Sequence, residues 1–247
     1  MTIVLVHGVP ETPGVWDSLR AALNRTDLTA LQLPGFGCPR PEGFGATKEE
    51  YVEWLVGGLE GLQADGPIDL VGHDWGGGLV VRLVSTRPEL VQSWVTDAAG
   101  LGAPDFEWHD FAKIWQTPGE GEKFFADQLA QPVEERGAVF EMLGLPKDKA
   151  VELAGWLDQT MVDCILDLYR SATEVGQEWA PDFHDIPAPG LVLAPSDDVF
   201  QAEGRSEAAA QRAGAAVEAL TGVGHWWMLQ DPETAAGVLQ RFWSTVG

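Results

Sequence analysis

The chain has 247 residues, of which 15 are Lys or Arg and 38 are Asp or Glu, so its formal net charge is -23. This charge repels the phosphates of nucleic acids and the head groups of anionic lipids, and we expect neither nucleic acid nor a membrane as a partner. Hydrophobic residues make up 45% of the chain, which is enough for the core of one globular unit and argues against intrinsic disorder.

The start of the chain and its cysteines favour a reducing compartment. The apolar run Ile3–Val6 has no basic flank and no cleavage site after it, and no stretch reaches the length of a membrane span. Cys38 and Cys164 are too few and too far apart to indicate a disulfide framework or a zinc site. We therefore expect a soluble, cytoplasmic protein with two reduced thiols, whose oligomeric state the sequence leaves unknown.

Short apolar runs alternate along the chain with segments of helical periodicity. The predicted strands are Ile3–Val6, Leu28–Leu33, Ile68–Gly72, Trp94–Thr96, Leu191–Ala194 and Ala216–Leu220. The predicted helices are Trp16–Leu23, Lys48–Leu62 with Thr47 as its N-terminal cap, Gly76–Val84, Glu203–Arg212 and Pro232–Trp243. This alternation is typical of an α/β fold with a mostly parallel sheet and helices on both faces.

Residues 100–184 interrupt the alternation. They are rich in Trp, Phe, Leu, Glu and Lys at helical spacing and contain no convincing strand. We predict a core formed by residues 1–99 and 185–247, with residues 100–184 inserted as a helical cap.

The first chemical motif lies where the strand Ile68–Gly72 meets a helix. Gly72-His73-Asp74-Trp75-Gly76 has the form Gly-x-nucleophile-x-Gly, in which the glycines permit a strained turn that exposes the central side chain. A carboxylate at Asp74 needs no base to become nucleophilic, and attack on a carbon with a leaving group would form an ester. A base is then needed only for the hydrolysis of that ester.

His225 is the candidate base, because it stands in a glycine-rich loop directly after a predicted strand. The base needs an acidic partner that holds the imidazole in one tautomer. Asp197 and Asp198 follow the strand Leu191–Ala194, and Asp97 is a weaker alternative.

Two backbone donors could stabilise the oxyanion of the intermediate, namely the N–H groups of Val9, after the first strand, and Trp75. His7 in the same loop is interpreted as structural. The sequence has no nucleotide-binding loop and no clustered metal ligands, so it indicates no metal and no organic cofactor. We expect a small apolar substrate and water.

These motifs resemble the Asp-nucleophile branch of the α/β hydrolases, which contains epoxide hydrolases and haloalkane dehalogenases. The resemblance extends over the whole chain and follows the family order of nucleophile, acid and base. It implies that Asp74 is the nucleophile, that Asp198 is the acid and that His225 is the base.

The cap distinguishes the two branches. Epoxide hydrolases carry two cap tyrosines that donate to the epoxide oxygen, and the segment Leu166–Arg170 resembles one of their motifs, with Tyr169 as the donor. Trp115–Glu122 resembles the other motif, and its donor position is occupied by Phe111. The resemblance thus implies a substrate pocket that includes Phe111 and Trp115.

Haloalkane dehalogenases hold the halide with two N–H donors, one of them the Trp after the nucleophile, which Trp75 supplies. The second donor could be a cap tryptophan, and four are available: Trp108, Trp115, Trp156 and Trp179. Epoxide hydrolysis is our preferred hypothesis, with haloalkane dehalogenation as the alternative. A third hypothesis is a ligand-binding or non-hydrolytic protein of the same fold. Such a protein has no need for Asp74, Asp198 and His225 together, so the presence of all three argues for an enzyme.

Overall fold

A parallel sheet organises the protein in this computed structural model, which describes residues 2–246. The strands of the described chain are β1 (Thr2–Val6), β2 (Leu28–Leu31), β3 (Ile68–Gly72), β4 (Ser93–Thr96), β5 (Gly190–Pro195) and β6 (Ala216–Leu220). They lie in the order β2-β1-β3-β4-β5-β6, and every neighbouring pair is parallel. The predicted α/β class is confirmed.

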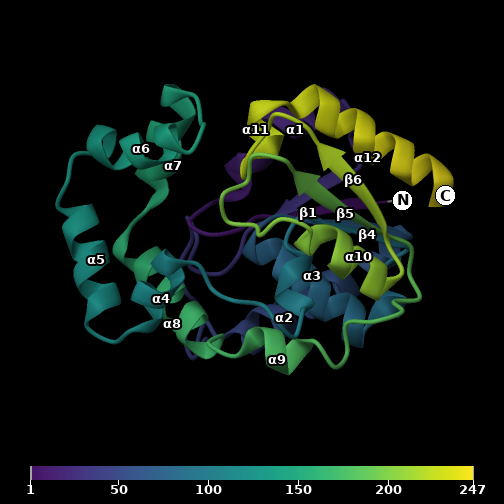
Figure 1. Ribbon diagram of the computed structural model, residues 1–247, viewed down its shortest axis with the longest axis horizontal. Coiled ribbons are helices and arrows are strands. Elements are labelled where there is room, and N and C mark those ends of the chain that lie inside the picture. Colours follow the sequence, from purple (N-terminus) through teal and green to yellow (C-terminus); the bar gives the residue numbers. More distant parts are fainter. Residues whose placement is uncertain (1, 247) are drawn as a thin grey trace.

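Helices cover both faces of this sheet (Figure 1). The helices of the core are α1 (Asp17–Leu23), α2 (Lys48–Leu62), α3 (Trp75–Thr86), α10 (Arg205–Ala213), α11 (Trp227–Gln230) and α12 (Pro232–Val246). Short 3-10 helices η1 (Pro13–Trp16), η2 (Gln63–Asp65), η3 (Pro88–Leu90) and η4 (Ala99–Gly102) lie in the connections.

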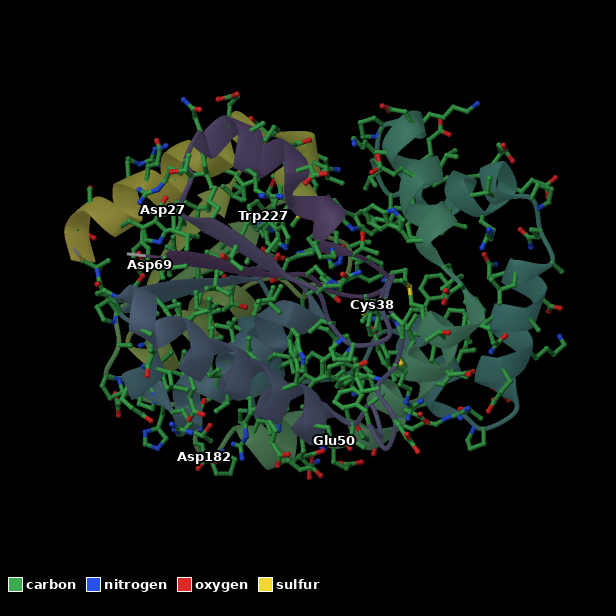
Figure 2. The ribbon with its side chains drawn as sticks, turned by 180° about the vertical axis from the view of Figure 1, so that it is seen from behind. Asp27, Cys38, Glu50, Asp69, Asp182 and Trp227 are labelled. Carbon is green, nitrogen blue, oxygen red and sulfur yellow. The ribbon has the colours of Figure 1, made fainter. Side chains whose placement is uncertain are left out.

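Alternate side chains of each inner strand enter the two helical layers, because successive residues of a strand face opposite sides. Ile3 and Leu5 of β1 pack in the cluster that contains α1 and α12, whereas Val4 and Val6 pack in the cluster of α2, α3 and α10. Figure 2 shows Trp227 in the first of these layers, between the sheet and the outer helices. Both faces of the inner strands are therefore buried, and their residues are mostly apolar.

The ends of some elements differ from the prediction by one to three residues. The strand predicted to end at Leu33 ends at Leu31, because the backbone N–H of Leu33 donates to the imidazole Nε2 of His7 (3.1 Å) and leaves the ladder. The helix predicted from Trp16 begins at Asp17, after the 3-10 turn of η1. Thr47 caps α2 as predicted, in a reciprocal capping box with Glu50.

Between β4 and β5, all of whose connecting residues are described, the chain forms helices and no strand. These helices are α4 (Asp110–Gln116), α5 (Glu120–Leu129), α6 (Val133–Met142), α7 (Lys147–Trp156), α8 (Gln159–Ser171) and α9 (Val175–Trp179). Figure 1 shows α4 to α8 as a group beside the sheet, on the side toward which β5 and β6 run. The division into a core and a cap of residues 100–184 stays a prediction, because helices alone do not define a domain boundary.

Both cysteines are free thiols, and Cys164 is buried while Cys38 is partly exposed. Cys38 lies on the loop between the sheet and the group of α4 to α8 (Figure 2). Among residues 2–246, no helix combines the length and the apolar character that crossing a bilayer requires.

Candidate active site

Four loops at the carboxyl ends of the strands carry the polar groups of the site. Val9 follows β1, Asp74 follows β3, Asp198 follows β5 and His225 follows β6. In a parallel sheet all these ends meet at one edge, which is where open α/β sheets bind ligands. The group of α4 to α8 lies on the same side (Figure 1).

The predicted strained turn is present at Asp74. Its backbone has φ 50° and ψ -123°, a conformation that costs free energy in any residue with a side chain. The flanking glycines are required by close packing, because a Cβ at Gly72 would lie 2.4 Å from the Gly76 carbonyl oxygen and one at Gly76 would lie 2.2 Å from that of Val6. The turn therefore depends on both glycines and presents the Asp74 side chain to the loop after β1.

The Asp74 carboxylate is held by backbone donors. The N–H of Val9 donates to Oδ1 at 2.8 Å, and the N–H of Trp75 also stabilises its charge. Burial raises the pKa of Asp74 to about 6, although the nearby His225 and His73 oppose that rise. At neutral pH the group is mainly ionised, with one oxygen bound and Oδ2 turned toward His225.

His225 is oriented by Asp198. Its Nδ1 lies 3.0 Å from Asp198 Oδ2, and its Nε2 lies 3.8 Å from Asp74 Oδ2, too far for a hydrogen bond. Burial by itself would lower the pKa of His225, but the Asp198 carboxylate outweighs it and the pKa is raised. Burial would likewise raise the pKa of Asp198, which His225 and the N–H of Phe200 hold below its usual range.

Of the three acidic candidates, only Asp198 contacts His225 among the described residues. Asp198 is buried, whereas its neighbour Asp197 is exposed and accepts a hydrogen bond from Ser196 Oγ. Asp97 is bound instead to His73 and accepts the backbone N–H of Asp74.

His73 joins two buried carboxylates beneath the nucleophile. Its Nδ1 lies 2.5 Å from Asp97 Oδ2 and its Nε2 lies 3.1 Å from Glu11 Oε1. Burial would lower the pKa of His73, but these two carboxylates raise it well above its usual value. Burial would raise the pKa of Glu11, which the His73 charge lowers to about 2. The group is therefore a fully buried imidazolium between two carboxylates.

This buried cluster connects three catalytic loops. Asp97 accepts the backbone N–H of Asp74 (2.9 Å) and the indole N–H of Trp227 (2.6 Å). Glu11 accepts the N–H of Gly8 (2.8 Å) and the indole N–H of Trp226 (2.6 Å). Because Trp226 and Trp227 directly follow His225, the cluster holds the loop of the base against the turn of the nucleophile.

His7 is structural, as predicted. Its Nδ1 bonds to the carbonyl of Gly8 at 2.9 Å, and its Nε2 accepts the N–H of Leu33. Burial lowers its pKa to about 4, so the ring is neutral and both nitrogens are satisfied.

Two cavities meet at the catalytic groups. The first is mostly apolar, includes Phe111 and Trp115 among its walls and measures about 950 Å³ together with its opening to solvent. The second is more polar and reaches Asp97 and Gln201. Both are bordered by four residues: Asp74, His109, Phe200 and His225. The two predicted pocket residues thus share one cavity with Asp74 and His225.

Tyr169 of α8 is close to the nucleophile but lines neither cavity. Its ring packs against those of Trp75, Trp108 and Trp115. Burial raises its pKa well above the usual value, and the charge of Asp74 adds to that rise. The Tyr169 hydroxyl is therefore protonated at neutral pH.

Sequence reasoning missed His109, which borders both cavities. Its Nδ1 accepts the backbone N–H of Ala112 (3.2 Å) at the start of α4, so the proton of the neutral ring is on Nε2. Burial lowers its pKa to about 4, and the nearby His225 contributes to this. Its position two residues before Phe111, the residue at the expected donor position, was the available signal.

The cap tryptophans differ in whether their indole N–H is free. That of Trp108 donates to the carbonyl of Ala172 at 2.8 Å. The N–H groups of Trp75 and Trp115 are buried without a partner among the described residues. Trp179 packs against Arg82, and Trp156 packs near Gly14. Of these two, Trp115 lines the apolar cavity and Trp75 lines neither cavity.

The model of the alpha/beta hydrolase family matches residues 3–238. The chain belongs to this family. A similar protein is (E)-2-((N-methylformamido)methylene)succinate hydrolase from Acinetobacter baylyi. The two sequences are 24% identical over 197 residues, and this alignment covers 79% of the present α/β hydrolase and 72% of that relative.

Solved structures with the same fold include two enzymes of different specificity. An epoxide hydrolase from Bacillus megaterium is 18% identical, with a TM-score of 0.78 over 98% of this α/β hydrolase and 93% of that chain. A haloalkane dehalogenase from Bradyrhizobium elkani is 18% identical, with a TM-score of 0.73 over 99% and 91% of the two chains. At such identities the likeness shows the fold, so the reaction must be argued from the site.

The buried cluster makes a testable contribution to the stability of this α/β hydrolase. Asp97→Asn should lower the free energy of unfolding by about 3 kcal/mol, because an amide cannot balance the His73 charge or accept the three N–H donors around it. Urea unfolding measures the change. The exposed Asp197→Asn is the matched control and should stay within about 0.5 kcal/mol of wild type; equal midpoints for the two variants would contradict the assigned role.

Proposed function

We propose that this hydrolase opens an epoxide to a diol through an ester on Asp74. The observation that carries the proposal is the carboxylate at the strained turn, with Oδ1 bound by Val9 and Oδ2 facing a His–Asp pair. An Asp at this position can only attack as a carboxylate, which suits a tetrahedral carbon with a leaving group.

In the first step Asp74 Oδ2 forms a bond to a ring carbon of the epoxide. The C–O bond of the ring breaks, and its electron pair stays on the ring oxygen, which takes a proton from a donor in the site. Oδ1 becomes the carbonyl oxygen of the ester, still bonded to the N–H of Val9. The backbone therefore assigns different roles to the two oxygens.

In the second step a water that has given its proton to His225 attacks the ester carbonyl carbon. The resulting oxyanion on Oδ1 faces the N–H groups of Val9 and Trp75. Collapse breaks the bond between that carbon and Oδ2, which leaves with the substrate as the second hydroxyl of the diol and takes the proton back from His225. The water oxygen stays on Asp74, and its remaining proton returns to the donor that protonated the ring oxygen. The products are the diol and the Asp74 carboxylate.

The charges favour this order of events. In the free enzyme the Asp74 carboxylate contributes to the raised pKa of His225. Ester formation removes that negative charge, so the pKa of His225 should fall when the imidazole must act as a base. The buried positive charge of His73, whose ring lies 4.7 Å from that of His225, lowers it further.

Two groups can donate to the oxygen of the opening ring. Tyr169 lines neither cavity, but its protonated hydroxyl is close to Asp74, where the ring opens. His109 lines the cavity and has an N–H at Nε2. An alkoxide is a strong base and needs such donors. His109 would supply the second donor, which the sequence lacks at Phe111.

Haloalkane dehalogenation is the second candidate, supported by one specific observation. The indole N–H groups of Trp75 and Trp115 are buried without partners in the described chain, and a halide needs only such donors. Its first step would again form the Asp74 ester, with the carbon–halogen bond breaking and the halide leaving with the electron pair.

The ester mechanism is tested by two variants. Asp74→Asn should form no covalent adduct, because a neutral amide is a poor nucleophile. His225→Gln should form the ester and then stall, with ester hydrolysis slowed about a hundredfold or more. Intact-mass spectra after mixing with an epoxide would show unmodified protein for the first variant and protein plus one substrate for the second.

The acid next to His225 supplies the control. Asp198→Asn should slow the same hydrolytic step, and the neighbouring Asp197→Asn should not. An active Asp74→Asn preparation without deamidation, or a His225→Gln enzyme that never accumulates the adduct, would rule out the proposed ester.

Ester formation should depend on the ionisation of Asp74. Because its pKa is raised to about 6, the reactive carboxylate is lost as the pH falls through that value. The single-turnover rate of adduct formation should be half-maximal near pH 6 and fall to about a tenth of its plateau at pH 5. A rate that stays constant down to pH 5 in protein that remains folded would contradict this assignment.

The leaving group is decided by donor variants in single-turnover experiments. With an epoxide, Tyr169→Phe and His109→Asn should each slow ester formation at least about tenfold, since each removes a donor to the alkoxide. Asn is chosen at 109 because it can still cap α4. Trp75→Phe and Trp115→Phe should have smaller effects with the epoxide.

A bromoalkane of similar size tests the second candidate. A dehalogenase would react with it, lose most of that rate in Trp75→Phe and Trp115→Phe, and tolerate Tyr169→Phe. If the two tryptophan variants lose the rate, the tyrosine variant keeps it and the epoxide does not react, the function is dehalogenation and not epoxide hydrolysis.

A further inference from the structure

The apolar cavity has two sets of polar side chains in its walls. Asp74, His109 and His225 form the catalytic set. Gln128 of α5 and Arg136 of α6 form the other set, and the mechanism uses neither of them. Figure 1 shows α6 at the far end of the helical group from α8. The lining of the cavity includes residues of α5, α6 and α7 beside the catalytic set.

Arg136 is incompletely satisfied in this apolar wall. Its Nη1 donates to the carbonyl of Leu157 in a long bond of 3.3 Å, and its Nε is buried without a partner among the residues that the structure describes. Side chains around it in the cavity include Val139 and Leu153. Arg136 is only partly exposed, so its guanidinium has lost part of its hydration and would gain free energy by pairing with an anion.

No acidic side chain of the described chain pairs with Arg136, even though the sequence has 38 Asp and Glu residues. In a protein with a net charge of -23, a cation left unpaired at a cavity wall is a specific attraction for a negative group on a ligand. The guanidinium fork matches a carboxylate geometrically.

We propose that Arg136, assisted by the side-chain amide of Gln128, forms a carboxylate-binding subsite, and that the substrate has an apolar body with a carboxylate at the end remote from its reactive carbon. The substrate class rests on the proposed function, because the reactive carbon must reach Asp74 in the same cavity. Neither Lys nor a second Arg lines this cavity, so the single positive charge of Arg136 suits a monoanionic carboxylate better than a doubly charged phosphate.

Binding of an unreactive ligand tests the subsite independently of turnover. Calorimetry should show that octanoate binds the wild-type protein about tenfold more tightly than octanamide, which has the same apolar body without the charge. Arg136→Gln should abolish that preference, and Arg136→Met is the second variant if the first does not fold. Arg205→Gln is the matched control, because Arg205 lines only the second cavity and should leave the preference unchanged.

Turnover of a matched pair of substrates connects the subsite to the reaction. For an epoxide with a terminal carboxylate, Arg136→Gln should raise KM about tenfold and leave kcat nearly unchanged, while KM for the corresponding amide should not change. If neither epoxide reacts, the proposed function fails while the binding experiment still decides the subsite. The subsite would be overturned if octanoate and octanamide bind the wild type equally. It would also be overturned if the preference for octanoate survives Arg136→Gln or disappears in Arg205→Gln.

Discussion

The backbone N–H of Asp74 donates to Asp97, and the rest of the site depends on this bond. Asp74 has a backbone conformation that is unfavourable for a residue with a side chain, so surrounding contacts must hold it there. Asp97 accepts that N–H through one carboxylate oxygen, while His73 and the indole N–H of Trp227 bind the other oxygen and stabilise the buried charge. The same buried group thereby maintains the strained turn and positions the loop that carries the base.

The first half-reaction of the proposed mechanism needs a charged Asp74, and the second needs a neutral His225. The same set of charged groups favours each state in turn. An ionised Asp74 is the proposed nucleophile, and its charge helps to keep the pKa of His225 raised. A neutral ester then removes that charge, while the buried imidazolium of His73 remains nearby. In the proposed mechanism the pKa of His225 is thus higher before the ester forms and lower afterwards. The neutral imidazole, which can accept a proton from water, is therefore favoured in the ester.

Core and inserted helices contribute different things to the site. The turn, the base and its acid all come from loops at the ends of core strands, where the sheet fixes their positions. The groups that would discriminate between substrates come from the helical segment between β4 and β5: His109, Trp115, Gln128, Arg136 and Tyr169. Structures of the same fold are named for epoxide hydrolysis and for haloalkane dehalogenation, consistent with the general rule that one fold supports several chemistries through changes around a common site.

The sequence by itself determined the features that depend on local chemistry. Runs of apolar residues predicted the strands of the sheet, and the Gly-x-Asp-x-Gly pattern predicted the turn, since only glycine tolerates the close backbone contacts at Gly72 and Gly76. Residue types alone left Asp197 and Asp198 as alternatives, and the family resemblance favoured Asp198. The tertiary structure adds that Asp198 is the one of the two that the fold buries against His225.

The tertiary structure also decided every feature that joins distant segments. Trp226 reaches Glu11, which lies 215 residues earlier, and no local pattern in either segment signals that contact. His109 caps α4 and Arg136 lies within α6, and neither position signals a function by itself. Both become candidates only because the fold places them on the wall of one cavity with Asp74. Local residue types therefore determine the elements and the turn, whereas burial, charge balance and cavity position depend on long-range packing.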